Sequence, residues 1–185
     1  DEPVMTVVKH EITHRMKDLA PKEYMAYRDF AVEVMSDWGL GTKTTIEALQ
    51  LDYRNQDNVD IDVTTAMDEI AADMTRVILS DEKALKRFID HAKTSKANMN
   101  MANKFFQAVR EFINKVKATF SGNRQKMDEA TRNEFGLTLE QLERAESLWK
   151  EAYRASETSA EKTTGAKTNG TDTDIKKSLK KDNNK

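Results

Sequence analysis

The chain offers very few points at which a helix would have to stop. Its 185 residues include only two prolines and six glycines, the two residue types that interrupt helices most strongly. Apolar residues recur every three or four positions through most of the sequence, which is the spacing of one helix face. Alternation with a period of two is scarce, and the best strand candidate is the short stretch near residues 59–63. The sequence therefore predicts a mainly α-helical fold.

Local end signals divide this pattern into separate helices. Pro21 suits the first turn of a helix, and Gly39 and Gly41 would end that helix. Ser80 would cap a later helix, and a capping box beginning at Thr138 would start the last one. The predicted helices cover residues 4–19, 22–38, 43–55, 64–79, 81–93, 95–120, 124–134 and 139–156.

A change of composition separates the body of the chain from its end. Small and polar residues dominate 157–185, where the only large aliphatic side chains are Ile175 and Leu179. So little apolar surface cannot offset the entropy lost on ordering. We therefore predict one domain over 1–156 and a disordered tail or linker over 157–185. The basic run 175–181 could touch nucleic acid or an acidic partner, but no aromatic residue interleaves with its lysines, which favours a solvated linker.

Composition also excludes several classes of chemistry and partner. The chain has no cysteine, which rules out disulfides, cysteine nucleophiles and thiolate metal sites, so any metal must be held by His, Asp or Glu. The net charge of −2 provides no overall field for nucleic acid. No apolar run approaches the roughly 20 residues of a membrane span. We expect no nucleic-acid partner, no membrane partner and a cytoplasmic location. Because the first residue is Asp1, we also expect an excerpt of a larger parent chain.

The most specific local pattern is HExxH at residues 10–14. On a helical wheel His10 and His14 fall about 40° apart, on the side away from an apolar stripe, and Glu11 lies between the pair and the stripe edge. The helix would thus be anchored by one face and would present both imidazoles on another. The stripe consists of Val8, Ile12, Met16 and Leu19.

This arrangement is typical of metal hydrolases. Two histidines at i and i+4 can each give one ring nitrogen to a single ion, and Glu11 can take a proton from a metal-bound water as general base. Chance is the alternative, because a chain of this composition contains the motif about once in two hundred cases. The helical context favours a site.

A third ligand could come from the apolar, predicted helical stretch 64–78. Glu69 and Asp73 lie at i and i+4, just beyond the edge of its apolar arc. One carboxylate could complete the metal shell, and the other could accept the second ring N–H of a ligating histidine. A solvated acidic face is the alternative reading of this pair.

Other candidates are less specific. His91, the third histidine, lies on a charged amphipathic helix and suits a surface or rim position better than a metal ligand. Tyr24, Tyr27 and Tyr53 could each donate an O–H to the oxyanion of a tetrahedral intermediate, but packing roles suit them as well. The apolar stripe in 99–120 predicts a core helix, with a basic amphipathic helix on a membrane surface as the alternative.

His10-Glu11-Ile12-Thr13-His14, followed downstream by Glu69-Ile70-Ala71-Ala72-Asp73, resembles the HExxH and ExxxD motifs of gluzincin zinc metallopeptidases. The resemblance implies that His10, His14 and Glu69 ligate one Zn²⁺, that Glu11 is the catalytic base, and that Asp73 contacts a ligating histidine. Most of residues 4–156 are also similar to metallopeptidase-like domains of very large phage and integrative-element proteins.

The chain departs from the gluzincin pattern in two ways. The interval between His14 and Glu69 is longer, so the predicted helices at 22–38 and 43–55 would be inserted between the ligands. The small sheet that usually precedes the HExxH helix is missing from this excerpt, and activity could require it. We predict a multi-helix, zincin-like domain that hydrolyses peptide bonds of a peptide or protein substrate in a bacterial cell. The alternative is a non-catalytic helical interaction or scaffold module of a phage or mobile-element protein.

Overall fold

The structure, a computed structural model, describes residues 3–37 and 41–168. Within these ranges it contains helices joined by short turns and no β-strand, which confirms the predicted mainly α class. The elements are α1 (Pro3–Leu19), α2 (Pro21–Asp37), α3 (Thr42–Asp57), α4 (Val63–Ser80), α5 (Glu82–Ala92), α6 (Lys96–Asn123), the 3-10 turn η1 (Arg124–Lys126) and α7 (Glu129–Thr168).

The contacts within the chain divide it into two compact units, Asp1–Ser147 and Leu148–Lys185. The first unit carries all the candidate site residues. In the second, α7 continues as a helix through 157–168, in place of the tail predicted from residue 157 onward. Alanine, glutamate and lysine in this segment are good helix formers, and extending an existing helix avoids the cost of nucleating a new one. Residues 169–185, with the basic run, lie outside the described part.

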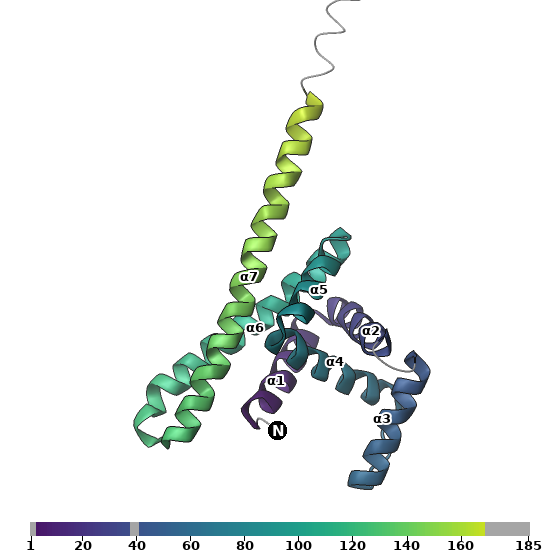
Figure 1. The fold of residues 1–185 in the computed structure, drawn as a ribbon, viewed down its shortest axis with the longest axis vertical. Helices are drawn as coiled ribbons and strands as arrows, with labels where there is room; N and C mark the ends of the chain where they lie inside the picture. The colour runs from purple at the N-terminus through teal and green to yellow at the C-terminus, as the bar shows by residue number, and fades with distance from the viewer. Residues whose placement is uncertain (1–2, 38–40, 169–185) are drawn as a thin grey trace, which may run out of the picture. The chain divides into compact units, whose positions relative to one another are not determined.

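Helices α1, α2 and α4 pack against one another, and α6 packs along α1, α2 and α5 (Figure 1). The predicted stripe explains the position of α1, because Val8, Ile12 and Met16 are at most 1% exposed. Helix α3 contacts α2 and α4 at the edge of the bundle. The HExxH helix is therefore held between α4 on one side and α6 on another.

An aromatic cluster forms the centre of the first unit. The Phe105 ring centroid lies 5.0 Å from those of Tyr27 and Phe88 and 5.1 Å from that of Phe106. Each fully buried phenylalanine contributes about 1.5–3 kcal/mol of transfer free energy. The stripe in α6 is thus core, as predicted, and Met101, Phe105, Val109 and Ile113 are all buried.

The helix ends agree with the sequence signals only in part. Pro21 begins α2, as predicted, and that helix ends at Asp37. Gly39 lies outside the described residues. Gly41 precedes α3 with a φ of 88°, a left-handed conformation that glycine adopts without strain. Its N–H donates to the Ser36 carbonyl in the last turn of α2 at 3.4 Å, so this residue both closes α2 and begins the next helix.

The strand candidate near 59–63 is wrong, because Asp62 caps a helix there. Its carboxylate Oδ1 accepts a hydrogen bond from the Thr65 backbone N–H at 2.7 Å, and α4 begins at Val63. The cap of α5 is likewise Asp81, whose Oδ1 accepts from the Ala84 N–H at 2.8 Å, and not Ser80.

The two helices predicted at 124–134 and 139–156 are one continuous helix, α7. A single glycine inside a helix costs about 1 kcal/mol. Gly136 nevertheless does not break α7, because Leu142 and nearby side chains are buried on one face of this helix. Thr138, the predicted cap, is buried inside the helix. The real start signal is Asp128, whose carboxylate accepts a hydrogen bond from the Thr131 N–H at 2.7 Å.

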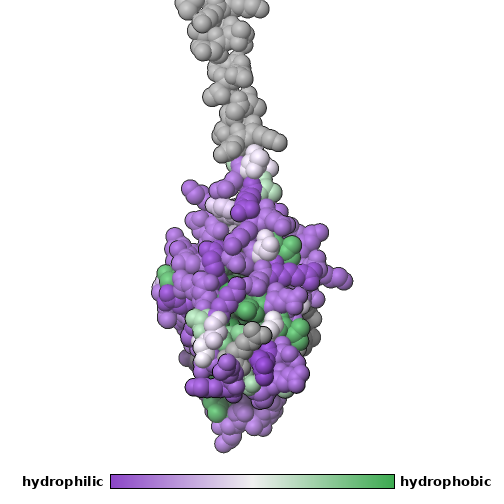
Figure 2. Space-filling model, turned by 90° about the vertical axis from the view of Figure 1, so that its left-hand side faces the viewer, coloured by the Kyte–Doolittle hydropathy of each residue, from purple (hydrophilic) through white to green (hydrophobic). Residues whose placement is uncertain are grey.

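The surface is mostly hydrophilic. Figure 2 shows small apolar patches scattered among polar side chains on the face turned to the viewer. No helix in the described ranges has both the length and the apolar character needed to cross a membrane.

Candidate metal site on α1

Adjacent residues of α1 face different neighbours. Successive side chains on a helix are rotated by about 100°, so His10 and Glu11 cannot share one direction. His10 lies toward α4, where its closest charged neighbour is Glu69, and Glu11 lies toward α6, where it meets Lys115. The predicted ligands and the predicted base therefore belong to two sides of one helix.

On the α4 side, the structure brings His10 and Glu69 together. His10 Nε2 lies 3.9 Å from Glu69 Oε2, and the side chains are 37% and 26% exposed. His14 follows one turn along α1, with its ring centroid 6.4 Å from that of His10 and the ring planes 36° apart. Two potential metal ligands, from α1 and α4, thus meet here, and His14 lies beside His10 on α1.

These residues fit a zinc ion by donor type and, for one pair, nearly by distance. Two ligands that each lie about 2.0–2.1 Å from a tetrahedral zinc are about 3.3 Å apart, so His10 and Glu69 would have to approach by about 0.6 Å. Across residues 3–37 and 41–168, no three His, Asp or Glu side chains already stand in a metal-binding arrangement. The site would have to close around an ion.

A third helix reaches the same place through Tyr53. Burial, the negative charge of Glu69 and a hydrogen bond to Glu69 together raise the pKa of Tyr53 to about 12. The other two candidate tyrosines are engaged in the interior: the Tyr24 hydroxyl donates to Asp68 at 2.7 Å, and the Tyr27 hydroxyl lies 2.7 Å from Thr75 Oγ1. Tyr53 is therefore the candidate tyrosine beside Glu69, a choice that the sequence left open.

Asp73 has a different partner from the predicted one. Its carboxylate Oδ1 accepts a hydrogen bond from Lys9 Nζ at 2.6 Å, which joins α4 to the residue before His10. This pair ties the same two helices together. Asp73 therefore influences His10 indirectly, by holding α1 against α4.

Asp68, directly before Glu69, is a half-buried carboxylate with three hydrogen-bond partners, which sequence reasoning missed. It accepts hydrogen bonds from Tyr24 at 2.7 Å, from Lys17 Nζ at 2.8 Å and from Arg28 at 3.4 Å. Burial by itself raises the pKa of Asp68, but these hydrogen bonds outweigh it and lower the pKa below its usual value. The partners lie 40 to 51 residues away in the sequence, so no local pattern could have revealed them.

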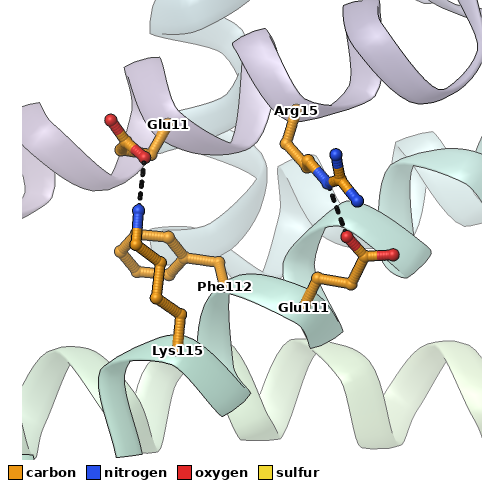
Figure 3. Close-up of a pocket in the computed structure, with 5 residues that line it drawn as sticks. All are labelled: Glu11, Arg15, Glu111, Phe112 and Lys115. Atoms are coloured by element: carbon orange, nitrogen blue, oxygen red, sulfur yellow. Dashed lines mark hydrogen bonds and ion pairs between the residues drawn. The ribbon is translucent and has the colours of Figure 1, made fainter. Parts of the chain in front are cut away.

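The α6 side holds Glu11 in an ion pair. Lys115 Nζ lies 3.1 Å from Glu11 Oε2, and one turn along each helix Arg15 Nε lies 2.5 Å from Glu111 Oε2 (Figure 3). Together with Phe112, these four side chains line a pocket of about 230 Å³. The carboxylate of Glu11 is therefore exposed to a ligand-sized space but already engaged by an ammonium group.

His91 lies away from these residues, on α5. Its ring packs on Phe30 with centroids 4.5 Å apart, and burial lowers the pKa of His91. This agrees with the predicted packing position at the rim.

Comparison with known proteins identified no relative of this chain. No family model matches the chain, no curated protein matches it, and no solved structure matches it. The geometry around α1 is therefore the basis for the proposed function.

Proposed function

We propose that the chain is a zinc-dependent peptidase domain in which His10, His14 and Glu69 hold one Zn²⁺. The observation that carries the proposal is the 3.9 Å distance between His10 Nε2 and Glu69 Oε2, from helices α1 and α4, with His14 one turn along α1. The two residues are 59 positions apart in sequence, and their meeting is what the combination of HExxH and ExxxD requires. Zinc is expected because the chain has no thiolate and this donor set suits it.

The residues around the ion have separate tasks. Bound zinc would polarise the scissile carbonyl and lower the pKa of a water bound at its open position. Glu11 would accept the proton of the attacking water and pass it to the leaving amine nitrogen, so that a C–O bond forms as the C–N bond breaks. Tyr53, beside Glu69, would donate its O–H to the developing oxyanion. For Glu11 to act, its carboxylate has to leave Lys115.

The test is the zinc content of the purified protein and of His14→Ala and Glu69→Ala variants, measured by elemental analysis. About one zinc per chain, lost in both variants, is the expected result for three protein ligands. Zinc lost with His14 but retained without Glu69 would show that the third ligand is another residue. An unaltered helical circular-dichroism spectrum of each variant provides the control for folding.

A non-catalytic interaction or scaffold module is the second candidate. The observation that favours it is the engagement of both remaining acidic residues by lysines, Glu11 by Lys115 and Asp73 by Lys9. A scaffold needs no metal, so wild-type protein with no zinc after dialysis against excess zinc would support this reading instead. The phage or mobile-element context stays an inference from the resemblance.

A further inference from the structure

A cluster of three hydroxyl groups lies buried where α1, α2 and α4 meet. Thr75 and Tyr27 are 0% exposed, and Thr13 is 6% exposed. Thr75 Oγ1 lies 2.7 Å from the Tyr27 hydroxyl and 3.2 Å from Thr13 Oγ1, and it donates to the Ala71 carbonyl at 3.0 Å. Thr13 Oγ1 also lies 2.5 Å from the Lys9 carbonyl oxygen, and its single proton can go either to that carbonyl or to Thr75 Oγ1, which has lone pairs for both Thr13 and Tyr27. Every hydroxyl in the cluster is satisfied by groups of the protein itself.

Such a cluster restricts how two helices can slide past each other. Apolar side chains lose little when they exchange one apolar neighbour for another, whereas a buried hydroxyl separated from its partners loses hydrogen bonds that water cannot replace. A slip of α4 by one turn, about 5.4 Å, would separate Thr75 from Thr13. The ion pair of Lys9 with Asp73 is more exposed and weakened by salt, so it fixes the register less strongly.

The same register brings the proposed ligands together. Thr13 follows His10 by three residues on α1, and Thr75 follows Glu69 by six on α4. Because each helix is rigid over one to two turns, the offset between the two threonines also sets the offset between His10 and Glu69. We propose that Thr75, contacting Thr13 and Tyr27, is a positioning residue that aligns His10 with Glu69 for metal binding. This inference rests on the proposed zinc site.

The experiment compares Thr75→Val, which removes the hydroxyl, with Thr75→Ser, which retains it. We expect the zinc Kd to rise about 10-fold or more in Thr75→Val, as for other residues that orient metal ligands, and to stay near the wild-type value in Thr75→Ser. Ile89→Val, a buried truncation in α5, is the matched control, because it loosens the core without touching the hydroxyl cluster. An unchanged zinc Kd in Thr75→Val would overturn the inference.

A second measurement works without metal. In the zinc-free protein, a nuclear Overhauser effect between the His10 ring proton Hε1 and the Glu69 side chain should be present in wild type and Thr75→Ser and weaker in Thr75→Val. An effect of equal strength in Thr75→Val would also overturn the inference. Wild-type protein that shows this effect but binds no zinc would contradict the proposed function and leave the alignment role intact. If Thr75→Val does not fold, Thr13→Val against Thr13→Ser makes the same comparison.

Discussion

The two sides of α1 differ in how their charged groups are satisfied. Toward α6, Glu11 and Arg15 each form an ion pair, with Lys115 and with Glu111. Toward α4, His10 and Glu69 face each other at 3.9 Å, and no Lys or Arg within the described residues forms an ion pair with Glu69. The α4 side also holds the ion pair of Lys9 with Asp73, but among the described residues Glu69 itself faces an imidazole and not a Lys or Arg.

This difference indicates which part of the HExxH motif depends on a bound ligand. At 3.9 Å, His10 Nε2 and Glu69 Oε2 are too far apart for a hydrogen bond, so their proximity contributes little stability until a metal ion joins them. The Glu11 pair, by contrast, is stable without a ligand, but it occupies the group that the proposed chemistry needs.

The largest expected effect concerns Glu11. In the zinc-loaded protein, Glu11→Gln should lower peptide hydrolysis by about 10²–10⁴-fold, because a general base is lost, while zinc content stays the same. The matched control is Glu111→Gln, which breaks the neighbouring ion pair on the same side of α1 and should leave hydrolysis nearly unchanged. Equal loss in both variants would mean that the pocket, and not the base, is what matters.

The α4 side is tested by zinc affinity. Glu69→Gln should weaken zinc binding by more than about 100-fold, a larger effect than that of residues outside the ligand shell. Asp73→Asn should weaken it by less than about 10-fold, since Asp73 contacts Lys9 and not a histidine. Isothermal titration with zinc measures both values. A larger loss of zinc affinity in Asp73→Asn than in Glu69→Gln would indicate that Asp73, and not Glu69, is the metal ligand.

Removing Lys115 tests whether its ion pair restrains Glu11 on the α6 side of α1. Lys115→Met should change the free energy of unfolding by less than about 1 kcal/mol, because the pair is solvent-exposed. It should also raise peptide hydrolysis a few-fold by freeing Glu11, whereas Arg15→Met should have a similar effect on stability and none on hydrolysis. Urea unfolding and a peptide assay on the same preparations check this, and slower hydrolysis by Lys115→Met would show that Lys115 assists Glu11.

The smallest effect is the pH dependence contributed by Tyr53. Burial beside Glu69 raises the pKa of Tyr53 to about 12, above the ordinary value of about 10, so the folded state keeps the phenolic proton at pH values where the unfolded chain loses it. Stability should therefore fall as the pH rises from about 10 toward 12 and stay unaffected by this group below 10. Tyr53→Phe should lose less stability over that interval. If wild type and Tyr53→Phe lose the same stability between about pH 10 and 12, the pKa of Tyr53 is not raised in the folded state.

The sequence predicted features that depend on neighbours along the chain. The apolar stripe of α1 correctly indicated which face is buried, and the stripe in α6 indicated core. The predicted starts at residues 64 and 81 each miss the observed starts of α4 and α5, Val63 and Glu82, by one residue, because several polar residues near each start could have served as the cap. The break predicted between residues 134 and 139, with a capping box at Thr138, is absent, since burial of one face of α7 outweighs the cost of about 1 kcal/mol for Gly136.

What this chain's sequence determined by itself is a set of helices and the face that each one buries, because both follow from a repeat of 3.6 residues. Only the tertiary structure decided that Glu69 lies by His10, that Lys115 holds Glu11, and that Tyr53 is the candidate tyrosine beside Glu69. These contacts join residues that are distant in sequence. They depend on how whole helices cross and on the buried hydroxyl cluster between α1 and α4, which no local pattern records.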